Sequence, residues 1–228
     1  YNKLNSFLNL AFPSTYIFTE DVMWDKILKS EDSRLFSREG DTIYGVTQDG
    51  NIYLNPNLEN TKASIHEFGH VWVDFIKSKN KEVYKRGEFL VKSSEEYKKA
   101  LDELGDHDSA ISEAMAILIS NKGSSLVTAS QKSKFSEWLK VLWKYVAQNF
   151  KNLRTMSPSA IKKMKMDEFI GGALHDLLRG QNLHDKNKSE SKYKFSLAPP
   201  TSSPAFKNWF GNSKVVNEDG SPKVVYHG

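Results

Sequence analysis

His66, Glu67 and His70 form an H-E-x-x-H pentapeptide, the pattern in this chain with the clearest chemistry. On a helix, residues four positions apart lie on one face, so the two imidazoles can bind a single metal ion. The glutamate lies one step further round, where its carboxylate can take a proton from a water that the metal activates. This geometry is typical of zinc hydrolases. The alternative is that the histidines are solvated surface residues and the match is accidental.

The residues around the pentapeptide predict a helix from Thr61 to Ser78, with Asn60 or Thr61 as its N-cap. Large apolar side chains recur at spacings of three and four: Ile65, Phe68, Trp72, Phe75 and Ile76. His66 and His70 fall about 120° to 160° away from this stripe. We therefore expect one face of the helix to pack on the core and a separate histidine face to line a cleft.

A catalytic zinc usually has three protein ligands and a water, so a third ligand must come from elsewhere. The chain has no cysteine, which leaves His, Asp and Glu. The metzincin continuation H-x-x-G-x-x-H is absent, because Val73 and Ile76 occupy its Gly and final His positions. The third ligand should therefore lie further along the chain, as the downstream glutamate does in gluzincins.

Glu113 is the favoured third ligand. It is the only charged residue in an apolar stretch from Ala110 to Ile119, which predicts a buried helix. A buried carboxylate without a cationic partner would be costly, and zinc would be such a partner. The rival ligands lie in a polar turn just before this helix: Asp106, His107 and Asp108. Asp74, on the histidine face, is either a hydrogen-bond acceptor for a ligand imidazole or a solvated surface residue.

Two short strands are predicted just before the histidine helix. Residues 42–46 and 52–54 flank an Asp49-Gly50 turn, which is the signature of a β-hairpin. The edge of such a sheet could hold an extended peptide beside the metal, although a purely structural hairpin fits the sequence equally well. In a peptidase, a further side chain would stabilise the negative oxygen that forms when water attacks the peptide carbonyl. The candidates for this role are Tyr44, Tyr53 and His107.

Most of the remaining chain is predicted to be helical. The expected helices cover residues 82–104 (one helix or a pair, with Phe89 buried), 132–150 and 166–179. The Glu113 helix should be capped by Asp108 or Ser109 and end at Asn121, Lys122 and Gly123. Residues 181–204 are rich in Lys, Ser, Asn and Pro, which predicts a polar linker.

The composition is that of a globular protein. At 228 residues, with 39% hydrophobic residues, the chain can bury a proper core, and no apolar run is long enough to span a membrane. The net charge of +4 is modest, so nucleic-acid binding is not indicated. The chain begins with Tyr1 rather than Met, so the absence of a signal peptide constrains its location only weakly.

Two stretches resemble known families. GNIYLNPNL, IHEFGHVWVDF and SEAMAILISNKG together resemble the zincin-like metallopeptidase domains of polyvalent proteins from phages and other mobile elements. This resemblance covers about residues 40 to 180, and implies zinc ligands at His66, His70 and Glu113 and a general base at Glu67. WFGNSKVVNEDGSPKVVYHG is similar to the start of an ADP-ribosyltransferase-like domain of such polyproteins, which implies that His227 is an NAD-site residue in a full-length parent only.

These observations predict a mostly helical α+β domain of the zincin type over residues 1–180, a linker over 181–204 and a truncated transferase-like start over 205–228. The predicted activity is zinc-dependent hydrolysis of a peptide or protein substrate. The alternative is a non-catalytic metal-binding or scaffold domain of the parent polyprotein. The protein is expected to work in the bacterial cytoplasm or to be delivered with the phage or mobile element. Its expected partners are other domains of the parent polyprotein.

Overall fold

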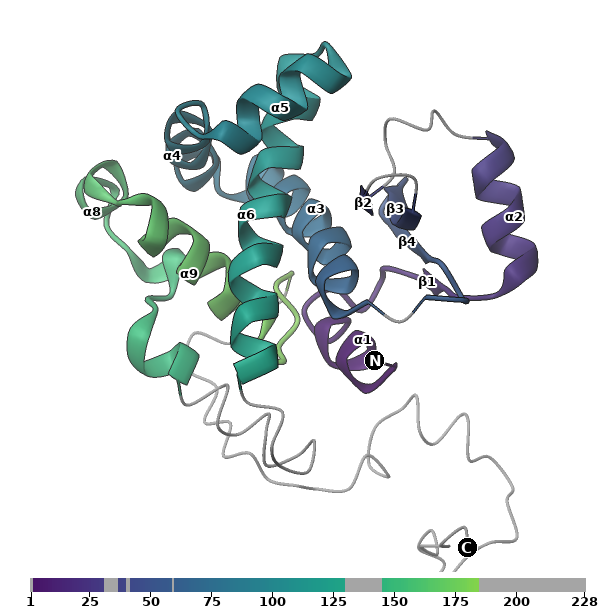
Figure 1. The fold of residues 1–228 in the computed structure, drawn as a ribbon. Helices are drawn as coiled ribbons and strands as arrows, with labels where there is room; N and C mark the ends of the chain where they lie inside the picture. Colours follow the sequence, from purple (N-terminus) through teal and green to yellow (C-terminus); the bar gives the residue numbers. More distant parts are fainter. Residues whose placement is uncertain (1, 31–36, 40–41, 59, 130–144, 185–228) are drawn as a thin grey trace, which may run out of the picture. The chain divides into compact units, whose positions relative to one another are not determined.

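The structure is a computed structural model that describes residues 2–30, 37–39, 42–58, 60–129 and 145–184. Within these residues the fold is α+β and mostly helical, as expected (Figure 1). The elements are α1 (Asn2–Leu8), β1 (Ile17–Phe18), α2 (Asp21–Ser30), β2 (Ser37–Glu39), β3 (Thr42–Gln48), β4 (Asn51–Leu54), α3 (Thr61–Lys79), α4 (Lys81–Val91), α5 (Glu95–Leu104), α6 (His107–Ala129), the 3-10 helix η2 (Leu153–Thr155), α8 (Pro158–Lys163) and α9 (Met166–Leu177).

The strands form one small sheet in the order β1-β4-β3-β2. β3 and β4 are the predicted hairpin, and their ladder closes at Gln48 and Asn51. Asp49 and Gly50 both have positive φ angles, 51° and 74°, as a two-residue hairpin turn requires. β2 extends the sheet beside β3, and β1 adds a parallel strand beside β4.

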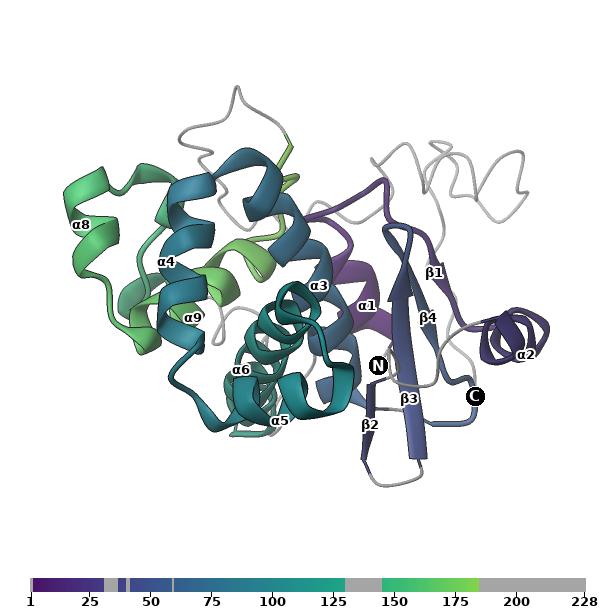
Figure 2. The same cartoon turned by 90° about the horizontal axis from the view of Figure 1, so that it is seen from above.

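The sheet lies between α2 and the helical layer that contains α3 (Figure 2). Side chains alternate across a strand, so β4 turns Ile52 and Leu54 into the main core. On the opposite face, Val46 of β3 packs with Trp24 and Ile27 of α2 in a smaller apolar cluster. The sheet is therefore held on both faces, which fixes its position against α3.

α3 is the central helix of the main core. All five residues of its predicted apolar stripe are buried, and Ile65, Phe68 and Trp72 are completely so. α6 packs along α3, and α9 contacts both of them. Since burying large apolar side chains contributes roughly 1.5 to 3 kcal/mol each, this stripe holds the histidine helix firmly in place.

The Glu113 helix is longer at both ends than the sequence predicted. α6 begins at His107. Its cap is Asp106, whose carboxylate accepts the Ser109 N–H at 2.8 Å, and not Asp108 or Ser109 as the sequence predicted. It also continues through Gly123 to Ala129. A Cβ at Gly123 would lie 3.0 Å from side-chain atoms of both Ile65 and Leu174. Gly123 therefore allows close helix packing and does not end the helix.

The predicted burial of Phe89 is wrong. Its side chain is 68% exposed on α4 and lies beneath the Arg86 guanidinium, 5.1 Å from it. The buried residues of α4 are Val83, Gly87 and Val91, at a spacing of four. A Cβ at Gly87 would lie 2.3 Å from Phe169 Cζ, so a glycine marks the face that meets α9. Apolar periodicity alone could not reveal this face, because its central residue has no side chain.

The packed domain extends beyond the predicted boundary at residue 180. Leu183 is only 4% exposed, and its N–H donates to the Ala11 carbonyl at 2.9 Å. Residues 185–204 of the predicted linker, the transferase-like start over 205–228 and residues 132–144 of a predicted helix lie outside the described residues. These parts of the predicted domain organisation remain predictions.

Candidate metal centre

α3 carries His66 and His70 on its second and third turns. The helix begins where Asn60 accepts the backbone N–H groups of Lys62 and Ala63 at 2.9 and 3.1 Å. This capping satisfies donors that the first turn would otherwise leave unpaired. With its start capped and its apolar stripe buried, α3 presents both imidazoles in a fixed orientation.

α6 packs along α3 and brings Glu113 to the face that carries the two histidines (Figure 1). The side chains of His70 and Glu113 are 19% and 27% exposed, so the site is partly open to solvent. The two helices approach closely at Gly69, where a Cβ would lie 3.2 Å from Ala116 Cα. Glu113 lies one turn before Ala116 on α6. The glycine between the two histidines thus lets α6 come near enough for Glu113 to reach both of them.

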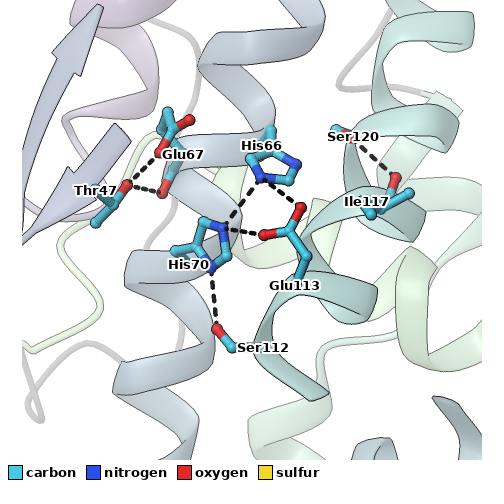
Figure 3. A network of polar contacts seen from close by, with 8 residues as sticks. All are labelled: Thr47, His66, Glu67, His70, Ser112, Glu113, Ile117 and Ser120. Carbon is cyan, nitrogen blue, oxygen red and sulfur yellow. Dashed lines mark hydrogen bonds and ion pairs between the residues drawn. The ribbon is translucent and has the colours of Figure 1, made fainter. Parts of the chain in front are cut away.

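Three side chains converge at this crossing (Figure 3). The Nε2 atoms of His66 and His70 are 3.1 Å apart. Glu113 places Oε1 3.5 Å from His66 Nε2 and Oε2 3.2 Å from His70 Nε2. Zinc–nitrogen and zinc–oxygen bonds of about 2.0 to 2.1 Å place tetrahedral ligand atoms about 3.3 Å apart. The distance between the two nitrogens therefore fits a zinc ion. His66, His70 and Glu113, the metal group, could hold a metal ion with one ligand atom each, all within 4.8 Å of one another.

Ser112 orients His70 from the neighbouring helix. Its Oγ lies 3.0 Å from His70 Nδ1, which directs Nε2 toward Glu113. Asp74, the acceptor considered from the sequence, is exposed. The only sequence signal for Ser112 was its position next to Glu113. Metal-binding histidines commonly use their second nitrogen in this way, and the contact orients the ring.

The charges of the site support one another. Burial alone would lower the pKa of His70, but the hydrogen bond to Glu113 and the charges of Glu113 and Glu67 outweigh it and raise that pKa. Burial also opposes ionisation of Glu113, yet the two histidines hold its pKa well below the usual value. Without metal, this contact therefore favours a proton on His70 and an ionised Glu113.

The Glu67 carboxylate lies beside Thr47 of β3, next to this group (Figure 3). Its side chain is almost completely buried, and its Oε2 accepts a 2.6 Å hydrogen bond from the Thr47 hydroxyl. Burial raises the pKa of Glu67, although the nearby histidines and Thr47 act in the opposite direction. A raised pKa suits a group that takes up a proton and then releases it.

The three rival ligand candidates all have other partners. Asp106 caps α6, and Asp108 pairs with Lys77 at 3.2 Å. His107 Nδ1 lies 2.6 Å from the Tyr97 hydroxyl, and the two rings stack. Among the described residues, none of these three joins the metal group.

Two of the oxyanion candidates also lie elsewhere: His107 is against Tyr97, and Tyr53 stacks on Phe18 with a ring separation of 4.9 Å. Tyr44 remains a candidate. His227 lies outside the described residues.

No helix in the described part of the chain is long and apolar enough to cross a membrane. Comparisons of the chain with models of protein families, with curated proteins and with solved structures give no match. Function therefore has to be inferred from the site itself.

Proposed function

We propose that this chain is a zinc-dependent peptidase domain of the zincin type, with His66, His70 and Glu113 as zinc ligands and Glu67 as general base. The observation that carries the proposal is the convergence of two imidazole nitrogens and one carboxylate, 3.1 to 3.5 Å apart, from two packed helices. Two nitrogens and one carboxylate are the donor set of gluzincin-type zinc hydrolases.

Each side chain has a distinct task in the proposed reaction. Zinc bound at this group would polarise the scissile carbonyl and lower the pKa of the attacking water. Glu67, which is not part of the ligand group, takes the proton from that water and passes it to the leaving amine. Ser112 keeps the His70 imidazole in its ligating orientation. The raised pKa of Glu67 supports this role, because it favours proton uptake at a higher pH than an ordinary glutamate allows.

The second candidate function is a structural or scaffold metal site. A closed structural zinc site has four protein ligands, whereas a catalytic site leaves one position to water. The metal group contains three residues among those described, and the nearby His107, Asp106 and Asp108 have other partners. The ligand count therefore favours the catalytic reading.

The setting of this activity is also a proposal. The resemblance to polyvalent proteins of phages and mobile elements supports a peptide or protein substrate and a larger parent protein, working in the bacterial cytoplasm or delivered with the element. The small sheet beside α3 is compatible with a peptide substrate, although the strand that contacts Glu67 is the interior strand β3 and not an edge strand.

The matched pair of wild type and Glu67→Gln tests the proposal. Both zinc-loaded proteins are incubated with a peptide library, and new termini are identified by mass spectrometry. Glutamine keeps the shape of the side chain but removes the base, so cleavage should fall by about 10² to 10⁴. A chelator should abolish wild-type cleavage, and added zinc should restore it. Equal cleavage by both proteins, or none by a zinc-loaded wild type, would contradict the proposed activity.

A further inference from the structure

The carboxylate of Glu67 is enclosed by β3. The Thr47 hydroxyl lies 2.6 Å from Glu67 Oε2 and 3.2 Å from the Glu67 backbone carbonyl. A hydroxyl has one proton to donate, and the shorter contact is the geometry of a strong hydrogen bond to a carboxylate. Oε1 of the same carboxylate is buried and has no hydrogen-bond partner in the described part of the chain. Among the described residues, Oε2 of Glu67 therefore has a hydrogen-bond donor and Oε1 has none.

Gly45 makes the second contact, two residues earlier on the same face of β3. A Cβ at this position would lie 2.9 Å from Glu67 Oε1 and 3.1 Å from Glu67 Cγ. Gly45 is paired to strands on both sides, with Ser37 and Leu54, and its φ angle is not positive. The backbone at this position therefore does not need a glycine. A glycine is needed there because a Cβ would collide with the Glu67 side chain.

The register of the β3–β4 hairpin holds both contacts in place. Val46 and Thr47 pair with Tyr53 and Ile52, and the two-residue turn at Asp49 and Gly50 sets this alignment. A slip of one residue would turn Thr47 to the α2 face of the sheet. The hairpin thus brings a hydrogen-bond donor and an open space to the Glu67 side chain of α3.

We propose that Gly45 and Thr47 form a glutamate seat, a pair of positioning residues that holds the Glu67 carboxylate for proton transfer. Thr47 occupies Oε2, and Oε1 is left as the atom that accepts the proton of the attacking water. This inference rests on the proposed peptidase function. It differs from a packing role because it predicts an effect on turnover that separates from zinc content and from substrate affinity.

The test compares Thr47→Val, which keeps the shape but removes the donor, with Thr47→Ser, which keeps the hydroxyl. Loss of a hydrogen bond to a charged group corresponds to about a 10- to 100-fold change. Thr47→Val should lower kcat by that factor with KM and zinc content within about twofold of wild type. Thr47→Ser should keep most of the wild-type kcat. Gly45→Ala, which displaces the carboxylate without straining the strand, should also lower kcat.

A second measurement does not depend on activity. Thr47→Val, Glu67→Met and the double variant form a cycle in which unfolding midpoints are measured. Methionine removes both acceptor oxygens, so Thr47→Val should shift the midpoint much less in its presence than in its absence. If the shifts in unfolding midpoint of the two single variants simply added in the double variant, Thr47 would not hold the Glu67 carboxylate, and the glutamate seat would be overturned even if the wild type is a peptidase. Coupled shifts with an unchanged kcat in Thr47→Val would overturn the positioning role, and coupled shifts with an inactive wild type would refute the proposed function instead.

Discussion

In the metal-free chain the contact between His70 and Glu113 favours a protonated imidazole and an ionised carboxylate, so a metal ion bound at this group would have to displace that proton. The pKa of His70 is raised because the contribution of Glu113 exceeds the cost of burial. Ligand imidazoles must be neutral, so the affinity of this group for a metal ion should fall as pH falls through the pKa of His70. Because that pKa lies above its ordinary value of 6.5, this competition begins at a higher pH than it would for an unperturbed histidine.

His175 is a second buried histidine with the opposite behaviour. It lies on α9, only 8% exposed. Burial, together with the charges of Arg179 and Arg154, lowers its pKa from 6.5 to about 4. The folded protein thus keeps this ring neutral at a pH where the unfolded chain would protonate it.

We expect His175 to make the fold sensitive to mild acid. Between about pH 6.5 and 4 the unfolded state binds a proton that the folded state does not, so stability is complete above this window and falls as pH falls through it. The loss should reach up to about 3 kcal/mol. His175→Gln should remove this acid-induced loss of stability, so its unfolding free energy should depend less steeply on pH. Both proteins are measured by urea unfolding in a chelator, so that zinc release does not contribute. Parallel pH profiles would contradict the assignment.

The residues of the site differ in how far the sequence could predict them. His66, Glu67 and His70 follow from a motif, and Glu113 from a single charge in an apolar helix; the structure brings the three ligand candidates together. Thr47 and Ser112 follow from no local pattern. Each meets its partner only when separate elements pack, 20 and 42 residues apart along the chain.

At the scale of elements, α3 and α9 are joined by a buried polar contact. The Trp72 indole N–H donates to Asp176 Oδ2 at 3.0 Å, and Arg154 lies 3.9 Å from the other carboxylate oxygen. Burial raises the pKa of Asp176, while Trp72 and the arginines act against that rise. Trp72 lies two residues after His70, so this contact helps to fix α3 beside the metal group.

Trp72→Phe and Phe89→Ala should differ greatly in their effect on stability. The first leaves a buried carboxylate oxygen without its donor and opens space in the core, which should cost about 2 to 4 kcal/mol. The second removes an aromatic ring that is 68% exposed, and should cost less than about 1 kcal/mol. Urea unfolding followed by circular dichroism at constant zinc measures both. A large loss of stability in Phe89→Ala would contradict the exposed position of this side chain.

The helices and the hairpin were largely predictable from local signals. The apolar stripe of α3, its Asn60 cap and the Asp49-Gly50 turn each act over a few residues. The end of α6 was not predictable in this way, because Gly123 has one meaning as a helix terminator and another as a point of close packing. Only the positions of Ile65 and Leu174 in the folded chain distinguish the two.

At the scale of the whole molecule, the site depends on three separate parts of the packed domain. α3 supplies two ligand candidates and Glu67, the proposed general base, α6 supplies the third ligand candidate, and Thr47 of β3 contacts Glu67. The packing that aligns them includes Leu183, near the end of the described chain, whose N–H bonds to Ala11. Composition predicted a polar segment from residue 181, but it could not show that one apolar residue within that segment completes the core.

Zinc content is the most direct test of the account. Wild type, His66→Ala, Glu113→Ala and Glu67→Gln are purified in parallel, and bound zinc is titrated against a competing chelator. We expect a single zinc ion per wild-type chain, a loss of affinity of more than about 100-fold in His66→Ala and Glu113→Ala, and nearly unchanged affinity in Glu67→Gln. Full zinc occupancy in Glu113→Ala, or loss of zinc in Glu67→Gln as large as in His66→Ala, would contradict the proposed roles.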